Sequence, residues 1–336
     1  MCWGTRKYCV CTLAFTAYVK LYLIMNDLTI FYSTLATVGA IVILGFFLGR
    51  SKWISEATNK QLINILLMIV MPCALFIAFP NEFDRGALNL FLAGLWGGLL
   101  VFIVLIAMSR LFFSKVTLKK AKVCSRYESQ FALMFNNATF LGFPLILMLF
   151  GPEALMPYCG FIIVFNLALF SYGVFLVQGK FDKQLLLNTL INPNIVAVVL
   201  GLIFFLLSWQ LPGPLNNGVS HVAAIMTPLS LICIGFMLSR ANFKELLGKK
   251  RLFVTAALQL TTVPLATWLV LYLIGVPVEV RNILVLIQAL PTATSLGLFA
   301  EKYGSECGST EASELVVIST LMSAVTLPIM LGLLIY

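Results

Sequence analysis

Ten long stretches of this chain are almost wholly apolar, and shorter polar and charged segments separate them. A helix needs about 20 apolar residues to cross the hydrocarbon core of a bilayer. Because backbone N–H and C=O groups find no water to bond in lipid, each stretch is expected to be helical. The pattern therefore predicts ten transmembrane helices, at residues 27–49, 60–80, 88–109, 129–150, 156–179, 194–210, 222–239, 252–275, 278–300 and 314–336.

The composition indicates a membrane protein and excludes a soluble one. Of the 336 residues, 61% are hydrophobic and 10% are charged, whereas soluble domains average about 45–50% apolar and about 25% charged residues. A chain with so few charges has too little polar surface to face water on all sides. The sequence therefore predicts an all-α integral membrane protein that lies in the lipid bilayer of the cell membrane.

Positive charge is concentrated in alternate connections between the apolar segments. Of the 22 Lys and Arg residues, 17 fall in the first, third, fifth, seventh and ninth connections. Lys and Arg are retained on the cytoplasmic side of a membrane, so both termini are predicted to be extracytoplasmic. The net charge of +9 is thus a sign of topology, and no nucleic-acid partner is expected.

Residues 1–26 fit this pattern poorly and are predicted to form an amino-terminal tail. Lys20 interrupts their apolar run, and no cleavage site typical of a signal peptide follows. Met25 directly precedes the well-formed first helix. Two interpretations stay open: translation starts at Met25, or the segment is a short tail that lies on the membrane.

The ten segments divide into two sets of five. Residues 27–179 form the first five-helix repeat and residues 192–336 the second, joined by a cytoplasmic connection at 180–191. Since five is odd, the second set enters the membrane from the opposite side, as in the inverted repeats of many secondary transporters. Prolines stand at matching places in the second and fourth helices of each set: Pro72 and Pro228, Pro144 and Pro291.

The fourth and ninth helices carry polar residues at mid-membrane beside these prolines. Proline removes a backbone donor and clashes with the preceding turn, so it kinks or breaks a helix. Polar side chains inside a membrane usually face protein or a water-filled cavity. The candidate residues of the fourth helix are Asn136, Asn137, Thr139, Gly142 and Pro144. Those of the ninth helix are Gln288, Pro291, Thr292, Thr294 and Ser295.

Two broken helices would make an anion site. Proline is favoured at the first position of a helix, so the helices are expected to resume at Pro144 and Pro291. Each helix amino terminus carries about half a positive charge and N–H groups that bind anions. Two termini suit one carboxylate of a small organic anion, with Asn137 as a further ligand. The alternative is that the prolines only kink the helices and the asparagines bond neighbouring helices.

Other polar residues give weaker indications. Asn166, in the middle of the fifth helix, either reaches the same cavity or bonds a neighbouring helix, and both alternatives stay open. Glu128, at the cytoplasmic end of the fourth helix, is expected to be solvated. All acidic residues lie at the ends of the apolar segments or between them. Ion coupling through a carboxylate at the membrane centre is therefore not favoured, and Na⁺ held by carbonyls and amides stays an alternative.

No cofactor, metal site or catalytic centre is predicted. The single histidine, His221, rules out a cluster of histidine ligands, and the eight cysteines show no metal-binding spacing. An intramembrane protease or acyltransferase needs a nucleophile with histidine, or paired aspartates, at membrane depth, and the sequence has neither. The chain is therefore not expected to be an enzyme.

Several short motifs resemble the auxin efflux carrier family. Residues 137–145, Asn-Ala-Thr-Phe-Leu-Gly-Phe-Pro-Leu, resemble its N-x-x-F-x-G-x-P-L signature. The stretch 290–294 resembles its second crossing helix, and residues 192–193 and 228–235 are similar to further family positions. The resemblance spans about residues 27–336.

This resemblance implies a ten-helix transporter with a scaffold domain and a crossover domain, in which the broken fourth and ninth helices cross at the substrate site. Family members carry organic anions, auxin in plants and malate- or malonate-type dicarboxylates in many bacterial relatives, and they often form homodimers. The long hydrophilic centre of the larger plant carriers is missing here, so the chain resembles the compact bacterial type. The ninth helix has no asparagine beside Pro291, which argues against auxin itself.

These residues predict a secondary transporter that moves a small organic anion, such as malate or another carboxylate, by alternating access. The alternatives are an anion channel and an auxin-like exporter of weak acids. Asn137 and the two helix amino termini are expected to ligate the carboxylate, while Pro144 and Pro291 hold the breaks.

Overall fold

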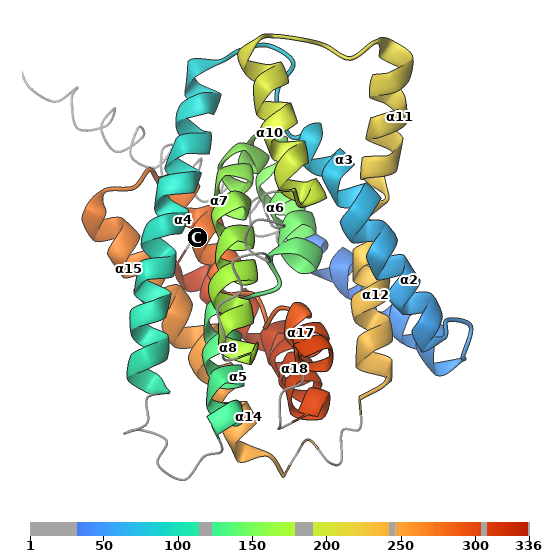
Figure 1. Ribbon diagram of the computed structural model, residues 1–336, viewed down its shortest axis with the longest axis vertical. Coiled ribbons are helices and arrows are strands. Elements are labelled where there is room, and N and C mark those ends of the chain that lie inside the picture. The colour runs from blue at the N-terminus through green and yellow to red at the C-terminus, as the bar shows by residue number, and fades with distance from the viewer. Residues whose placement is uncertain are drawn as a thin grey trace, which may run out of the picture.

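The computed structural model describes residues 32–113, 123–178, 191–241, 246, 248–303 and 308–334. Regular structure in these residues is helical, apart from one antiparallel β-bridge between Asn136 and Thr292. Most of the helices run along the long axis of the molecule (Figure 1). The tail predicted at 1–26 and most of the connection predicted at 180–191 lie outside the described residues.

Seven helices, several of them built from consecutive elements, are long and apolar enough to cross a membrane, and they match seven of the ten predicted segments. They are Tyr32–Arg50; Glu56–Phe76, formed by α2 (Glu56–Ile65), η1 (Leu66–Val70) and α3 (Met71–Phe76); α4 (Arg85–Phe112); Pro152–Val177, formed by η3 (Pro152–Ala154), α7 (Leu155–Ala168), η4 (Leu169–Gly173) and α8 (Val174–Gln178); Gly213–Ser239, formed by α11 (Gly213–Ala224) and α12 (Met226–Ser239); Lys250–Ile274, formed by α14 (Lys250–Ala257), η5 (Leu258–Thr262) and α15 (Val263–Ile274); and Glu311–Leu334, within α18 (Gly308–Leu334).

The other three predicted segments have a different form. α10 (Pro193–Leu206) is an apolar helix of 14 residues. The fourth segment is interrupted: α5 (Val123–Met134) ends, and the chain resumes in η2 (Ala138–Gly142) and α6 (Phe143–Phe150). The ninth is interrupted between α16 (Val278–Gln288) and α17 (Ser295–Tyr303). Helix breaks therefore occur in both segments for which the sequence predicted them.

Neither proline begins a resumed helix, contrary to the prediction. Pro144 is the second residue of α6. The chain already resumes at Ala138, because the side chain of Asn137 caps the first turn. Pro291 lies in the non-helical stretch between α16 and α17, and α17 begins four residues later, at Ser295.

A π-helical turn precedes each of three prolines. η1, η2 and η5 end two residues before Pro72, Pro144 and Pro264. A proline ring clashes with the carbonyl of the fourth preceding residue and supplies no N–H group. The wider i→i+5 turn shifts that carbonyl away from the ring. The helix therefore continues through these prolines, and the first break falls at the two asparagines before η2.

Glycines let the long helices α4 and α7 pack in direct backbone contact. A Cβ atom added to Gly94 would lie 2.0 Å from Pro157 O, and one added to Gly160 would lie 2.1 Å from Phe91 O. No side chain fits at such distances, and small residues at helix contacts are typical of membrane proteins. α4 and α7 thereby form a support against which α16 packs.

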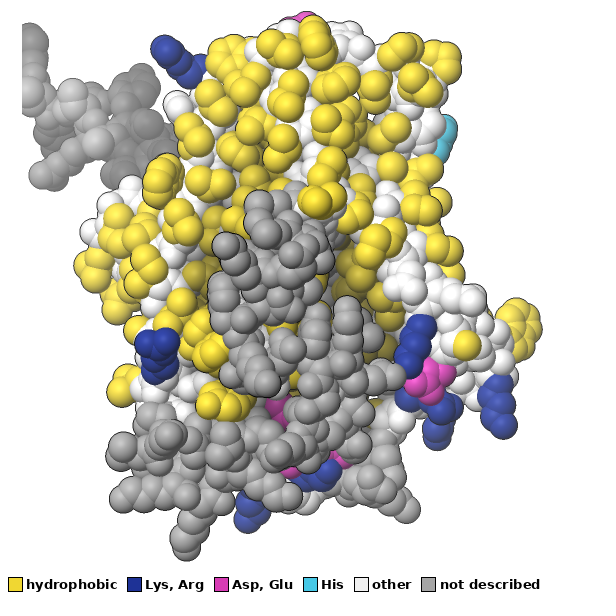
Figure 2. Space-filling view, viewed as in Figure 1, with side chains coloured by type: hydrophobic (Ala, Val, Ile, Leu, Met, Phe, Trp, Pro, Cys, Tyr) yellow, Lys and Arg dark blue, Asp and Glu magenta, His cyan; other side chains and the backbone are white. Residues whose placement is uncertain are grey.

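The outer surface is apolar over most of its height. Trp96, Ile103 and Leu273 are 63%, 64% and 72% exposed. Figure 2 shows hydrophobic side chains over the upper and middle parts of the visible face, with Lys, Arg, Asp and Glu mainly near the lower end. Such a surface suits contact with lipid chains, as the composition predicted.

Candidate functional site

The two helix breaks cross each other and pair through their backbones. Asn137 N donates to Pro291 O at 2.7 Å, and Ala293 N donates to Phe135 O at 2.9 Å. These two hydrogen bonds make the single β-bridge of the described chain. Unpaired backbone groups are costly inside a membrane, so each break supplies partners that the other has lost.

Two neighbouring helices complete the second break. Gln259 of η5 donates from Nε2 to Leu290 O at 3.2 Å, and its Oε1 accepts from Thr292 Oγ1 at 2.7 Å. The backbone N–H of Thr292 donates to Ser319 Oγ of α18 at 3.1 Å. Gln259 and Thr292 are 1% and 0% exposed. The second break is therefore held by side chains that lie outside the ninth segment.

The first break is held by a tyrosine and by one of its own asparagines. Tyr158 of α7 donates its hydroxyl to Ala138 O at 3.2 Å. Asn137 Oδ1 accepts from Phe140 N at 3.2 Å, which fixes the orientation of the Asn137 amide. The amide nitrogen Nδ2 is buried and has no hydrogen-bond partner in the described part of the chain.

Asn136 and Gln288 join the crossing helices through their side-chain amides. Asn136 Nδ2 donates to Gln288 Oε1 at 2.8 Å, and the two residues are 3% and 1% exposed. Asn136 Oδ1 and Gln288 Nε2 are also buried, without a partner among the described residues. An unpaired buried polar group costs about 1–3 kcal/mol, so polar groups of a ligand would be stabilised here.

A cavity of about 130 Å³ lies beside the crossing. Amide and hydroxyl side chains alternate in its wall with aromatic and aliphatic ones, and none of the described residues that line it is charged. The lining residues are Leu67, Met68, Asn136, Asn137, Thr139, Phe140, Phe165, Asn166, Leu169, Phe170, Asn192, Asn194, Ala293, Thr294, Ser295 and Phe299.

Both resumed helices begin at this cavity. Asn137 caps η2, Ser295 is the first residue of α17, and both residues line the cavity. The first N–H groups of a helix have no partner within the helix, and they give its amino terminus about half a positive charge. The two amino termini thus lie at one cavity, although each helix resumes at a residue other than the predicted proline.

The predicted site residues fall into two groups. Those that line the cavity are Asn136, Asn137, Thr139, Asn166, Thr294 and Ser295, and those outside its described lining are Gly142, Pro144, Gln288, Pro291 and Thr292. In the second group, Gln288, Pro291 and Thr292 take part in the crossing itself. Gly142 makes room for it, because a Cβ atom there would lie 3.0 Å from Leu290 Cδ1.

Asn166 lines the cavity, which was one of its two predicted alternatives. Its Nδ2 donates to Ile162 O of its own helix at 2.8 Å, and among the described residues it forms no hydrogen bond to a neighbouring helix. Asn192 and Asn194 also line the cavity. Asn192 Oδ1 accepts from Asn194 N at 2.9 Å and caps α10.

Sequence reasoning did not assign Asn192, Asn194, Gln259 or Ser319 to the site. Gln259 is an amide within an apolar segment, a signal that was available, because buried polar side chains in a membrane are costly unless they have partners. Asn192 and Asn194 indicated only a helix start. Ser319 is one of several small hydroxyl residues in its segment, and nothing in the sequence distinguishes it.

A second, much smaller cavity touches the same crossing. Asn137 and Thr294 line this space of about 10 Å³ as well as the larger cavity. Its other lining residues belong to α12 and α18: Ile234, Met237, Leu238, Val316, Val317 and Thr320. The crossing therefore has one cavity toward α7 and α10 and another toward α12 and α18.

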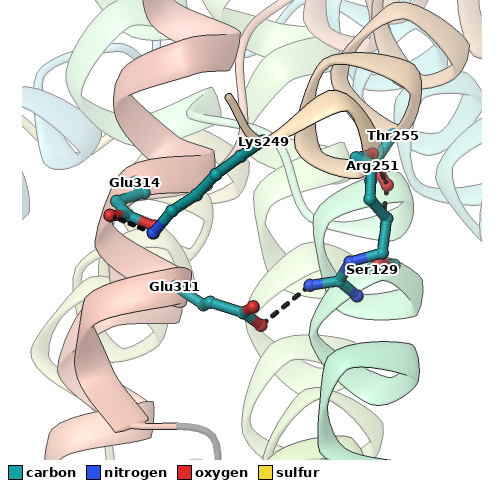
Figure 3. A network of polar contacts seen from close by, with 6 residues as sticks. All are labelled: Ser129, Lys249, Arg251, Thr255, Glu311 and Glu314. Atoms are coloured by element: carbon teal, nitrogen blue, oxygen red, sulfur yellow. Dashed lines mark hydrogen bonds and ion pairs between the residues drawn. The ribbon is translucent and has the colours of Figure 1, made fainter. Parts of the chain in front are cut away.

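Charged residues gather away from the cavity, where α14 and α18 begin. Lys249 Nζ lies 2.6 Å from Glu314 Oε1, and Arg251 Nη2 lies 2.8 Å from Glu311 Oε2, as Figure 3 shows. Glu128, expected to be solvated, is buried at 3% exposure, because α5 packs against α4, α14 and α18. Within the described residues, no group of three or more His, Cys, Asp or Glu is placed to hold a metal ion.

Comparison with known proteins indicates the class of molecule. A family model described as "Membrane transport protein" matches residues 30–184 and 179–331. A "Putative malonate transporter" of Rhizobium meliloti is 26% identical over 220 residues, which are 62% of this chain and 67% of that protein. An uncharacterized transporter of Escherichia coli is 25% identical over 322 residues, 90% and 97% of the two chains. One of Methanocaldococcus jannaschii is 24% identical over 267 residues, 75% and 83%.

Proposed function

We propose that this chain, which belongs to the membrane transport protein family, is a secondary transporter that moves a small organic anion across the cell membrane by alternating access. The family is the one that the resemblance to auxin efflux carriers indicated, so that prediction is confirmed. The chain is a multi-pass membrane protein whose relatives are named as transporters.

One observation carries the proposal: two broken helices cross at a cavity that is lined by amides and, among the described residues, by no charge. Half-helix amino termini aimed at a shared site are a common means of binding anionic groups in secondary transporters. Here Asn137 Nδ2 and the first N–H groups of η2 and α17 are the donors for a carboxylate. Thr139, Asn166 and Thr294 orient the rest of the substrate.

The size of the cavity supports a small carboxylate. A volume of about 130 Å³ is well above the roughly 10–15 Å³ that one water molecule needs in this measure, so the cavity has room for a small solute. The Rhizobium meliloti relative is named for malonate, so malonate and malate are the first substrates to test.

The architecture we propose has ten crossings. Seven long helices, α10 and the two interrupted segments supply them, as two inverted sets of five with both termini outside. Labelling of single cysteines placed in successive connections tests this arrangement. Every second connection should react only after the reagent is given access to the cytoplasmic side. Two successive connections that react from the same side would contradict the ten crossings.

The transport test is uptake of labelled malonate and malate into proteoliposomes that hold the wild type, Asn137→Ala or Asn89→Ala. Asn89 is exposed near the start of α4, so it is a matched control. We expect saturable uptake by the wild type and the control, and a loss of at least about tenfold in Asn137→Ala, the effect of one or two charge-assisted hydrogen bonds.

Each outcome has a distinct meaning. Equal uptake by Asn137→Ala and the wild type would refute the site, and no uptake of any acid by folded wild type would refute the function. Counterflow separates a carrier from a channel, because only a carrier accumulates label against an excess of unlabelled substrate inside the vesicle.

A further inference from the structure

Unpaired polar atoms surround the cavity of about 130 Å³ beside the crossing. Four of its lining residues each have a buried side-chain atom with no hydrogen-bond partner in the described chain: Asn136 Oδ1, Asn137 Nδ2, Asn194 Oδ1 and Ser295 Oγ. Amide oxygens only accept hydrogen bonds, amide nitrogens only donate them, and a hydroxyl does either. The site therefore needs a hydrogen-bond donor from its ligand as well as an acceptor.

Two residues of the wall present acceptors to that donor. Asn136 Nδ2 is bonded to Gln288 Oε1, so the unpaired atom of Asn136 is its Oδ1. Asn194 Oδ1 is the second unpaired amide oxygen among the lining residues, whereas Gln288 lies outside the described lining. The O–H of a neutral carboxyl group supplies the donor that these oxygens need.

The charge of the site sets a second condition. None of the described residues that line either cavity is charged or titratable. Tyr158, which contacts the first break, has its hydroxyl bonded to Ala138 O. Two helix amino termini supply roughly one unit of positive charge together. A doubly charged acid would keep one charge uncompensated in a membrane interior, and its carboxylates, which only accept, would leave the amide oxygens unpaired.

We infer that the site binds its acid in the singly charged form, with one carboxylate ionised and the other carboxyl group protonated. This inference rests on the proposed function. The ionised group accepts from Asn137 Nδ2 and the helix amino termini. The protonated group donates its O–H to Asn136 Oδ1 or Asn194 Oδ1, the unpaired amide oxygens of residues that line the cavity.

The proton travels with the substrate. On one side of the membrane a water-borne proton binds the free carboxylate of the dianion, and on the other side the same O–H bond breaks and the proton returns to water. One proton therefore crosses with each acid, and no residue of the chain has to change its protonation state.

The test measures KM for malonate in proteoliposomes with equal pH on both sides. Above the second pKa of malonic acid, the KM expressed as total malonate should rise about tenfold for each pH unit, because the singly charged form falls by that factor, while Vmax stays constant. Malonamate, the monoamide, stays singly charged over this pH range and keeps an N–H donor in place of the O–H. Its KM should not change with pH, which also controls for effects of pH on the protein.

A third acid isolates the donor. Monomethyl malonate is also singly charged over this pH range but has no donor, and its KM should exceed that of malonamate by about three- to tenfold, the effect of one hydrogen bond. Asn136→Ala removes one of the two unpaired amide oxygens, so the difference between the two acids should shrink in that variant. A merely structural role for Asn136 would raise both KM values together.

Three results would overturn the inference while leaving the proposed function intact. They are a malonate KM that stays constant or falls as the pH rises, equal KM values for malonamate and monomethyl malonate, and a malonate KM that depends on Na⁺ and not on pH. If the folded wild type moved none of the three acids at any pH, the proposed function and the inference would both fail.

Discussion

Replacement of Gln259 by leucine should destabilise the protein, because this buried amide holds the second helix break together. The change keeps the approximate size of the side chain but removes its bonds to Leu290 O and Thr292 Oγ1. Both of those groups would then be buried without partners, at about 1–3 kcal/mol each, so the expected loss of stability is about 2–6 kcal/mol. Thermal unfolding in detergent should show a fall in Tm on the order of 5–10 °C.

Two comparisons make this prediction refutable. Gln61→Leu is the matched control, because Gln61 is exposed on α2, and its Tm should equal that of the wild type. Thr292→Val should lower the stability less in the Gln259→Leu background than in the wild type. In the wild type the change leaves Gln259 Oε1 unpaired, whereas in the double variant that oxygen is already absent. Gln259 does not hold the break if Gln259→Leu unfolds at the same temperature as Gln61→Leu. The same conclusion follows if the stability losses of Gln259→Leu and Thr292→Val are simply additive.

Three further changes test other contacts. Gly160→Val should abolish a monodisperse size-exclusion peak because its side chain meets a backbone carbonyl of α4, whereas Gly213→Val, which meets no atom within 4 Å, should not. The Lys249–Glu314 pair is partly exposed, with side-chain exposures of 36% and 12%. Lys249→Gln should therefore lower the free energy of unfolding by less than about 1 kcal/mol, and its difference from the wild type should shrink in high salt. A large loss of stability that does not depend on salt would contradict this. Tyr158→Phe removes a single hydrogen bond and should lower stability by about 1 kcal/mol, clearly less than the glutamine change in the same thermal assay.

Apolar segment length predicted most of the helices, since lipid imposes one requirement on all of them. It placed most ends of the seven long helices and α10 within about five residues, but it began the seventh segment at 222, nine residues after the observed start at Gly213. It could not place the helix breaks, because a proline's effect depends on the turn before it. Pro144 follows a π-helical turn and stays within its helix, while the break falls at Asn136 and Asn137. The Asn136 side chain bonds Gln288 of α16, and the Asn137 side chain caps the turn that follows it.

The site was predictable where one segment holds the whole signal, and not where two distant segments meet. Asn137, with the glycine and proline that follow it, stands out in the sequence by itself. Gln288 and Asn136 are 152 residues apart, and Asn194 looks like an ordinary helix-start residue until α10 is placed beside the crossing. Pairing of this kind depends on the tertiary fold, which local patterns do not encode.

The β-bridge between the breaks also limits how the protein can change shape. To part the two chains, Asn137 N, Pro291 O, Ala293 N and Phe135 O would all lose their partners in an apolar interior, at about 1–3 kcal/mol for each group. We therefore expect the crossing helices to move as one body. This body packs against α12 through η2 and α6, so that contact is where we expect the movement. Since Asn137 and Thr294 border both cavities, a displacement of this body along α12 would change which cavity these two residues face, with no hinge at the site itself.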